Sequence, residues 1–351
     1  MPYIEFGCRP TIIGSMPHTS PVEACALITN HLKDFPTWPQ LPNRSFLENM
    51  YVQYSEGFPG VVIEGIGEDA RPEEGHIHVD RSADLSKPLE KLYSAYLENK
   101  IDELPISEKY AAGLHRFLSL SHPSALGIKG HVTGPVSWGL TVTDQDRRSI
   151  IYDDTLADAA AKLLRLKATW QEKELKRLNK NTIIFVDEPY MSSFGSAFVS
   201  ISREKVVTLL EEVFGGITGL KGVHCCGNTD WSVLLCTSLD IVNFDAYNYA
   251  QSLSLYPKEV KRFLDRSGTI AWGIVPVYGD SLARETVASL KDRLEEAMAP
   301  FTRQGVPFRQ LARQSLLTPG CGLATLRTPE AAANALELLV ALSDAMRRRY
   351  L

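Results

Sequence analysis

The stretch that decides the fold is Thr182-Ile183-Ile184-Phe185-Val186-Asp187-Glu188-Pro189. Its consecutive β-branched and aromatic residues are typical of a strand that is buried on both faces, as strands of parallel sheets are. Two acids and a proline end the run and mark the end of the strand. Residues 154–178, rich in Ala, Leu and Lys, predict a long helix just before it. Because parallel strands need helical crossovers, this pair predicts an α/β fold with a parallel sheet.

The alternation of strands and helices continues in both directions along the chain. Further strands are predicted at residues 11–15, 60–64, 127–133, 222–226, 240–245, 269–275 and 316–319. Further helices are predicted at residues 21–33, 45–56, 88–99, 107–120, 202–214 and 329–349, and the polar residues 65–86 predict a long loop. Eight strands with intervening helices predict a (β/α)8 TIM barrel, as a single domain over residues 1–351.

Composition excludes several classes of partner. The chain has 351 residues, of which 44% are hydrophobic, so it can bury a core of barrel size. A net charge of -5 argues against nucleic acid and against an anionic membrane surface as partners. We see neither a signal peptide nor an apolar run long enough to span a bilayer, and we therefore expect a cytoplasmic protein. Its six cysteines are then expected to be reduced.

A metal site is predicted from two distant segments, Val223-His224-Cys225-Cys226-Gly227 and Thr318-Pro319-Gly320-Cys321-Gly322. Side chains alternate faces in a strand, so His224 and Cys226 project to the same side. Cys321 follows another predicted strand, and the carboxyl ends of barrel strands meet at one mouth. Zinc accepts His nitrogen and Cys sulfur, and a catalytic zinc keeps one position open. Asp245, also at a strand end, is a candidate fourth ligand.

Each of these features has a simpler interpretation. Buried cysteines often act as small hydrophobic residues, and Asp245 could instead cap a helix. The carboxylates of Asp187-Glu188-Pro189 could cap backbone amides, although a charge at the end of an apolar strand favours a binding role for Asp187. Trp138 could be core packing or a stacking wall for a ligand. His76 and His78 have the spacing of a ligand pair but no cysteine nearby.

Several catalytic patterns are missing from the sequence. It has no G-x-G-x-x-G or Walker pattern after Gly14, so a phosphate-binding loop is not predicted there. It also has no G-x-S-x-G elbow, so nucleophilic hydrolase chemistry has no support.

The motifs resemble a known family when they are taken together. Ile13-Gly14-Ser15-Met16-Pro17-His18, Thr133-Gly134-Pro135-Val136-Ser137-Trp138, Val186-Asp187-Glu188-Pro189, His224-Cys225-Cys226 and Thr318-Pro319-Gly320-Cys321-Gly322-Leu323 occur in the order of the catalytic half of cobalamin-independent methionine synthase. The resemblance covers residues from about 10 to 345. It implies a barrel of the uroporphyrinogen decarboxylase and methionine synthase superfamily. It also implies a zinc-bound homocysteine thiolate as the methyl acceptor.

The resemblance assigns roles to particular residues. His224, Cys226 and Cys321 match the zinc ligands of the family, and Asp245 stands where the family has a further ligand, Glu. Asp187 matches the acid that holds the homocysteine amino group. Ile13, Gly14 and Ser15 match the segment that contacts the amino-acid end of the substrate, and Glu64 matches a second amino-group partner. Trp138 is a further candidate substrate contact, from its stacking interpretation and not from the resemblance.

Two departures from the family bear on the methyl donor. Complete members have a second barrel that helps bind the folate donor, whereas this chain has room for one barrel. They also carry a His after the seventh strand that protonates the leaving folate nitrogen, whereas no His follows His224 here. A corrinoid cobalt can leave without a proton. We therefore expect a methylcorrinoid donor, carried by a partner protein, or a methylfolate donor with Tyr278 or Asp280 replacing the His.

Three other functions stay open at this stage. The chain could methylate another thiol, as corrinoid:coenzyme M methyltransferases do. It could be a porphyrinogen decarboxylase, which would need an Arg-rich pocket and no metal. It could also be a non-enzymatic barrel whose closed, structural zinc supports the binding of a partner.

Overall fold

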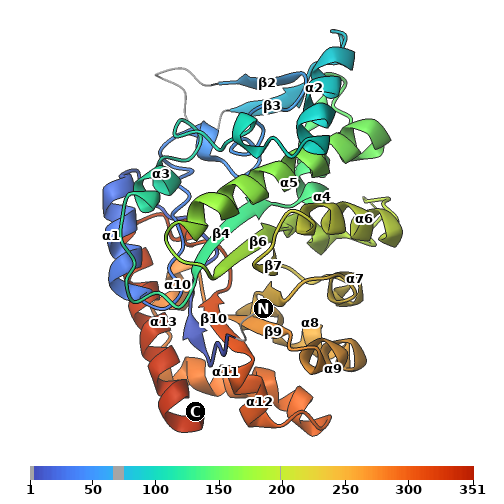
Figure 1. Cartoon of the computed structure of the whole chain (residues 1–351). Helices are drawn as coiled ribbons and strands as arrows, with labels where there is room; N and C mark the ends of the chain where they lie inside the picture. Colours follow the sequence, from blue (N-terminus) through green and yellow to red (C-terminus); the bar gives the residue numbers. More distant parts are fainter. Residues whose placement is uncertain (1–3, 66–74, 198) are drawn as a thin grey trace.

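The buried runs of the sequence form one curled parallel sheet (Figure 1). The computed structural model of the chain describes residues 4–65, 75–197 and 199–351. Within these residues the sheet has seven strands in the order β1-β10-β9-β8-β7-β6-β4, and every pairing is parallel. The strands are β1 (Arg9–Pro10), β4 (Ile128–Thr133), β6 (Thr182–Asp187), β7 (Leu220–Cys225), β8 (Ile241–Phe244), β9 (Thr269–Val275) and β10 (Ser315–Pro319). The predicted α/β class with a parallel sheet is confirmed.

Helices lie on the outer side of this sheet (Figure 1). They are α1 (Pro21–His31), α2 (Ser86–Leu97), α3 (Ala112–Leu118), α4 (Pro135–Thr141), α5 (Asp154–Lys176), α6 (Arg203–Phe214), α7 (Trp231–Leu235), α8 (Ala246–Ser254), α9 (Pro257–Asp265), α10 (Gly279–Leu282), α11 (Val287–Arg303), α12 (Phe308–Arg313) and α13 (Pro329–Tyr350). The longest, α5, begins where the Asp153 carboxylate accepts hydrogen bonds from the N–H groups of Thr155 and Leu156. Among the described residues, no helix combines the length and the apolar character needed to cross a membrane.

The second predicted strand is wrongly placed. Residues 60–64 do contain a strand, β2 (Val61–Glu64), but it pairs antiparallel with β3 (His76–Val79). With β5 (Thr143–Asp144) these two strands form a separate three-stranded sheet. Figure 1 shows β2 and β3 apart from the parallel strands. The apolar side chains of β2 are only half-buried, unlike those of the parallel strands. The predicted loop at 65–86 is also interrupted by β3, and residues 66–74 lie outside the described residues.

A proline-rich segment lies where a second strand of the parallel sheet would stand. Ser15 forms an isolated parallel bridge with Gln40, and Thr37 forms another with Lys129 of β4. The Lys129 N–H donates to the Pro36 carbonyl at 2.9 Å, and the Gln40 N–H donates to the Gly14 carbonyl at 3.0 Å. Prolines lack an N–H and interrupt a ladder of backbone hydrogen bonds, which explains why only isolated bridges form.

Two other boundaries differ from the predicted ones. The first strand is β1, which ends before the predicted residues 11–15, although the Thr11 N–H still donates to the Leu317 carbonyl at 3.0 Å. The helix predicted at 45–56 is only a 3-10 turn at Phe46–Glu48, followed by irregular backbone. Apolar residues in such a segment can be buried by the rest of the chain without helical periodicity.

The inner side of the sheet has an apolar layer and, above it, a polar layer. Ile183, Phe185, Ile241, Ala271 and Leu316 form the strand part of the apolar layer, together with Phe6 and Phe35. The polar layer lies nearer the carboxyl ends of the strands and comprises buried Thr133, Asp187, His224, Asn243 and Thr318. Buried Lys129 and His131 of β4 stand lower, as the register partners of Ile183 and Phe185. The candidate site therefore rests on a mainly apolar floor.

Gly222 makes room for the ring of Phe185 in that floor. A Cβ added at Gly222 would overlap the ring of Phe185, its register partner on β6. We predict that Gly222→Ala lowers the free energy of unfolding by about 1–3 kcal/mol because the ring must leave its position. The matched control is Gly279→Ala, where an added Cβ meets no atom within 4 Å. Chemical denaturation of the two variants measures the difference, and equal stabilities would contradict the packing described here.

Candidate metal centre

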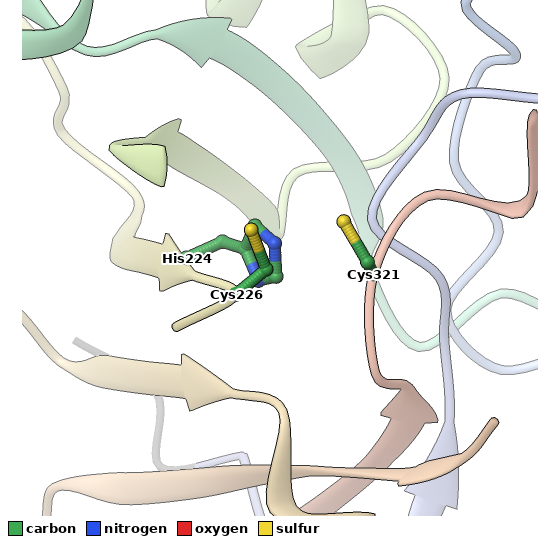
Figure 2. A group of neighbouring side chains, drawn as sticks. All are labelled: His224, Cys226 and Cys321. Carbon is green, nitrogen blue, oxygen red and sulfur yellow. The ribbon is translucent and has the colours of Figure 1, made fainter. Parts of the chain in front are cut away.

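The three predicted metal ligands come together at the carboxyl end of the sheet. Side-chain ligand atoms of His224, Cys226 and Cys321 all lie within 4.8 Å of one another. Figure 2 shows His224 and Cys226 at the end of one strand and Cys321 on the chain segment across from it. Among the described residues this is the only group of three or more His, Cys, Asp or Glu side chains close enough to share an ion. The sequence-based prediction that these residues converge is confirmed.

A break in the β9–β10 ladder brings Cys321 into position. The register shifts between Thr318 and Pro319, and the Gly320 N–H then donates to the Val275 carbonyl at 2.9 Å. A Cβ at Gly320 would come within 2.8 Å of a carboxylate oxygen of Asp245. Glycine at position 320 therefore allows the chain to pass close to Asp245 before it reaches Cys321.

The imidazole of His224 is held by Asn243 in one tautomer. Asn243 Nδ2 donates to the Ala271 carbonyl and to Thr318 Oγ1, both at 2.8 Å, so its Oδ1 must be the atom that faces His224. That oxygen lies 2.5 Å from His224 Nδ1. Because Oδ1 can only accept, Nδ1 carries a proton, and Nε2 is the nitrogen that can bind a metal. Nε2 is buried and has no hydrogen-bond partner among the described residues.

Asn243 is a candidate site residue that was not predicted from the sequence. It is fully buried in the middle of β8, whose other residues are Ile241, Val242 and Phe244. The sequence does carry a signal for Asn243, because a polar amide inside a short apolar strand must find hydrogen-bond partners when it is buried. Partners of this kind orient the histidine ligands of metal sites.

The two thiols shift each other's pKa in opposite directions: the pKa of Cys226 is lowered and that of Cys321 is raised. A hydrogen bond with the Cys321 thiol lowers the pKa of Cys226, and the positive charge that His224 can carry acts in the same direction. The same hydrogen bond, together with burial, raises the pKa of Cys321 well above its ordinary value. These shifts favour one thiolate in the pair, and a divalent cation would stabilise a second. Two sulfurs and an imidazole nitrogen fit zinc.

Asp245 is a helix cap in this structure. Its side chain accepts a hydrogen bond from the Asn248 N–H at 3.0 Å and another from Asn248 Nδ2 at 2.6 Å, at the start of α8. Burial raises the pKa of Asp245. The carboxylate is not part of the three-residue group. The helix-capping interpretation of Asp245 is thus observed, and its role as a fourth ligand stays a prediction.

Asp187 lies beside the metal group and has a free oxygen. It is the register partner of His224 across β6 and β7. Its Oδ1 is buried and has no hydrogen-bond partner in the described part of the chain. Burial raises the pKa of Asp187 to about 6, which the nearby charges of His224 and Lys129 oppose. An ion or an ammonium group from a ligand would stabilise this carboxylate.

The neighbouring acid, Glu188, has a structural role. Its carboxylate accepts hydrogen bonds from the Val136 N–H at 2.9 Å, the Ser137 N–H at 2.7 Å and Ser137 Oγ at 2.6 Å. These are the first backbone amides of α4, and burial raises the pKa of Glu188 to about 7. The capping interpretation of the Asp187-Glu188-Pro189 segment therefore holds for Glu188, whereas Asp187 remains available to a ligand.

The Ile13-Gly14-Ser15 segment lies along the inside of the sheet. Lys129 Nζ donates to the Ile13 carbonyl at 2.6 Å, and a Cβ at Gly14 would overlap the His131 ring. A Cβ at Gly322 would overlap Ser15 Oγ, so Ser15 lies against the residue that follows Cys321. Ser15 is thereby close to the metal group, as expected for a substrate contact.

Three other predicted site residues lie in different surroundings. Trp138 is buried, donates from Nε1 to the Tyr51 carbonyl at 2.7 Å and packs edge-on against Phe58, which matches its core-packing interpretation. Glu64 is exposed at the end of β2 in the separate sheet. Tyr278 follows β9 at the start of α10 and is 61% exposed.

The histidine pair also lies in the separate sheet. His76 and His78 stack on each other at 5.6 Å on β3 and belong to no metal-ligand group among the described residues.

Comparisons with known proteins place the chain by its fold. Searches against protein-family models and against curated proteins find no match. Among solved structures, a B12-independent methionine synthase from Shewanella sp. W3-18-1 in complex with selenomethionine matches with a TM-score of 0.51 and 18% identity, over 86% of this chain and 80% of that chain. A methyltransferase from Methanosarcina mazei matches with a TM-score of 0.54 and 17% identity, over 99% of this chain and 95% of that chain.

The chain shares the fold of these two proteins. The resemblance to cobalamin-independent methionine synthase that the motifs indicated is confirmed at the level of the fold. At identities of 17 and 18% the likeness concerns the fold alone, so the chemistry of the site must be argued from its own residues.

Loss of the Asn243 side chain is predicted to weaken metal binding. Without it, His224 loses the partner that fixes its tautomer and ring orientation, so Asn243→Ala should lower zinc affinity by about 10–100-fold. Competition with a chromogenic chelator measures that affinity, and circular dichroism checks that the fold is kept. An unchanged zinc affinity in a folded variant would contradict the orienting role.

Proposed function

We propose that this protein is a zinc-dependent methyltransferase that moves a methyl group to a thiol, with homocysteine as the preferred acceptor. The observation that carries the proposal is the convergence of His224, Cys226 and Cys321 beside a carboxylate, Asp187, that has an unused oxygen. The shared fold with a methionine synthase and a methyltransferase supports the same class of reaction. The proposed catalytic unit is a single barrel-like domain, with the proline-rich segment at residues 36–40 in the place of a second strand.

The three protein ligands suit thiol chemistry. Zinc, when bound, would keep the sulfur of the substrate deprotonated at neutral pH, where a free thiol with a pKa of ~8.5 is mostly protonated. His224, Cys226 and Cys321 would hold the ion and leave a fourth position for that sulfur. In the reaction, a bond forms between the thiolate sulfur and the methyl carbon while the bond from the methyl carbon to the donor breaks. The bonding pair departs with the donor.

Asp187 favours an aminothiol over a thiol without an amino group. Its unpartnered Oδ1 lies in the strand position next to His224, where it can accept a hydrogen bond from a substrate ammonium group. Ser15, against Gly322, is placed to contact the same end of the substrate. This observation supports homocysteine over the second candidate, a methyltransferase for other thiols.

The loop after β9 favours a methylcorrinoid donor, which we propose is carried by a partner protein. Reduced corrinoid cobalt leaves with the bonding pair and needs no proton, whereas a folate nitrogen must receive one. No histidine follows His224 in the sequence, and Tyr278 and Asp280 are exposed side chains at the start of α10. A methylfolate donor would require one of these two to supply the proton.

The remaining candidates receive less support from the site. A porphyrinogen decarboxylase would need cationic side chains for several substrate carboxylates, whereas the described site centres on two thiols, an imidazole and a carboxylate. A closed structural zinc would need a fourth protein ligand, and the predicted one, Asp245, lies outside the three-residue group and caps α8 with both of its oxygens.

Metal content tests the proposed zinc site. We predict that Cys226→Ser and Cys321→Ser lose most of their zinc because thiolates supply much of the binding free energy. Cys236→Ser is the matched control, since Cys236 is exposed beyond α7 and outside the group. Elemental analysis of the three purified variants gives the answer. Full zinc content in either of the first two variants would contradict the ligand assignment.

A donor assay tests the reaction. Zinc-loaded protein is incubated with homocysteine and either methylcobalamin or methyltetrahydrofolate, and methionine is measured by mass spectrometry. We predict turnover with methylcobalamin because its leaving group needs no proton. Turnover with the folate alone would refute the corrinoid donor, and no turnover with either donor for any thiol would refute the function.

A further inference from the structure

Two buried polar atoms next to the metal group have no partner. Thr133 of β4 is the register partner of Asp187 of β6, which in turn is the register partner of the metal ligand His224. Thr133 is 1% exposed and Asp187 8% exposed. Neither Thr133 Oγ1 nor Asp187 Oδ1 has a hydrogen-bond partner within the described residues. Because buried polar atoms are nearly always paired, two unpaired oxygens on neighbouring strands indicate a place for a ligand.

His131 adds two more unpaired atoms on the same face of β4. Alternate residues of a strand share a face, so His131 lies directly below Thr133. Gly130, the residue before His131, faces outward, because a Cβ there would overlap Gln171 of α5. His131 is 2% exposed, and neither of its ring nitrogens has a partner in the part of the chain that the structure describes.

Packing and backbone contacts hold the His131 ring in place. Trp38 stacks on the ring with centroids 3.9 Å apart, and Gly14 lies against the Nδ1–Cε1–Nε2 side of the ring, where it offers the nitrogens no side chain. The His131 N–H donates to the Gln171 side-chain oxygen at 2.9 Å, and the His131 carbonyl accepts from Tyr54 Oη at 2.8 Å. These contacts fix the imidazole ring, and none of them is a hydrogen bond to a ring nitrogen. A side chain that is preorganised to contact a ligand has this arrangement.

The polar atoms suit an ammonium group. Burial, and then the charge of Lys129, lower the pKa of His131 well below its ordinary value, so the imidazole is neutral and one nitrogen accepts. That nitrogen, Thr133 Oγ1 and Asp187 Oδ1 are three acceptors, and an ammonium group has three N–H donors. The carboxylate supplies the compensating negative charge.

We propose that Thr133 and His131, together with Asp187, form a pocket that binds the ammonium group of the thiol substrate. This inference rests on the proposed function and names two specificity-determining residues beyond those that the family resemblance supplies. Neighbouring strands are about 4.8 Å apart, so Asp187 stands one strand from the metal ligand His224. The pocket therefore selects a short aminothiol, and it rejects thiols of similar length that lack an amino group.

Thr133→Val and His131→Leu test the pocket in the full, zinc-loaded chain. Isothermal titration measures binding of homocysteine and of 4-mercaptobutyrate, which keeps the thiol and the carboxylate but lacks the amino group. We predict that either variant weakens homocysteine binding by about tenfold, the effect of one lost hydrogen bond to a charged group, and changes 4-mercaptobutyrate binding by less than about twofold. His131→Gln, which keeps a donor and an acceptor, should recover part of the loss.

Thr182→Val is the matched control for the removal of a buried strand hydroxyl. Thr182 begins β6 at the far end of the sheet, and its hydroxyl donates to Glu172 Oε1 at 2.7 Å. Its replacement should lower the unfolding midpoint of the ligand-free protein and leave both thiol affinities unchanged. Thr133→Val should not lower that midpoint, because the hydroxyl it removes has no partner.

The outcomes separate this inference from the proposed function. Equal losses of affinity for both thiols, no loss for either, or a destabilised ligand-free Thr133→Val protein would overturn the pocket. A wild-type protein that binds both thiols equally well contradicts the pocket and leaves the proposed function standing. A zinc-loaded wild type that binds neither thiol contradicts the function and the pocket together.

Discussion

The register of the parallel sheet is the constraint on which the site depends. Hydrogen bonding across β4, β6, β7, β8 and β9 aligns Thr133, Asp187, His224, Asn243 and Ala271 in one row. A shift of any strand by one residue would turn its member of the row toward the helices. The backbone ladder thus places a carboxylate, an imidazole and the amide that orients it side by side.

Burial makes this row chemically active. In water the same side chains would be solvated and would interact weakly. In the interior, each unpaired polar atom lowers the stability of the fold unless a ligand forms a hydrogen bond or an ion pair with it. The two thiols show the same effect, because the proximity that lowers the pKa of Cys226 raises that of Cys321. A cation and a substrate would each relieve part of this cost. The site is therefore built for ligands that bring a positive charge.

Most of the strands and the metal group were predictable from the sequence. Long buried runs such as 182–187 and 269–275 carry a strong strand signal, and the alternation of faces was enough to pair His224 with Cys226. The run at 61–64 begins with apolar residues, as the strands of the parallel sheet do. The sequence did not show that it pairs with β3, and this pairing decides which sheet it joins. The proline-rich segment that lies beside Lys129 gave no strand signal at all. Asn243, Thr133 and His131 acquire their roles from cross-strand neighbours that are distant in sequence.

X-ray absorption spectroscopy at the zinc edge of the zinc-loaded protein tests the central claim most directly. The account predicts a first shell of two sulfurs, one imidazole nitrogen and one light atom, which changes to three sulfurs and one nitrogen when homocysteine is added. A shell with fewer than two sulfurs, or one that homocysteine leaves unchanged, would contradict an open zinc site made by His224, Cys226 and Cys321.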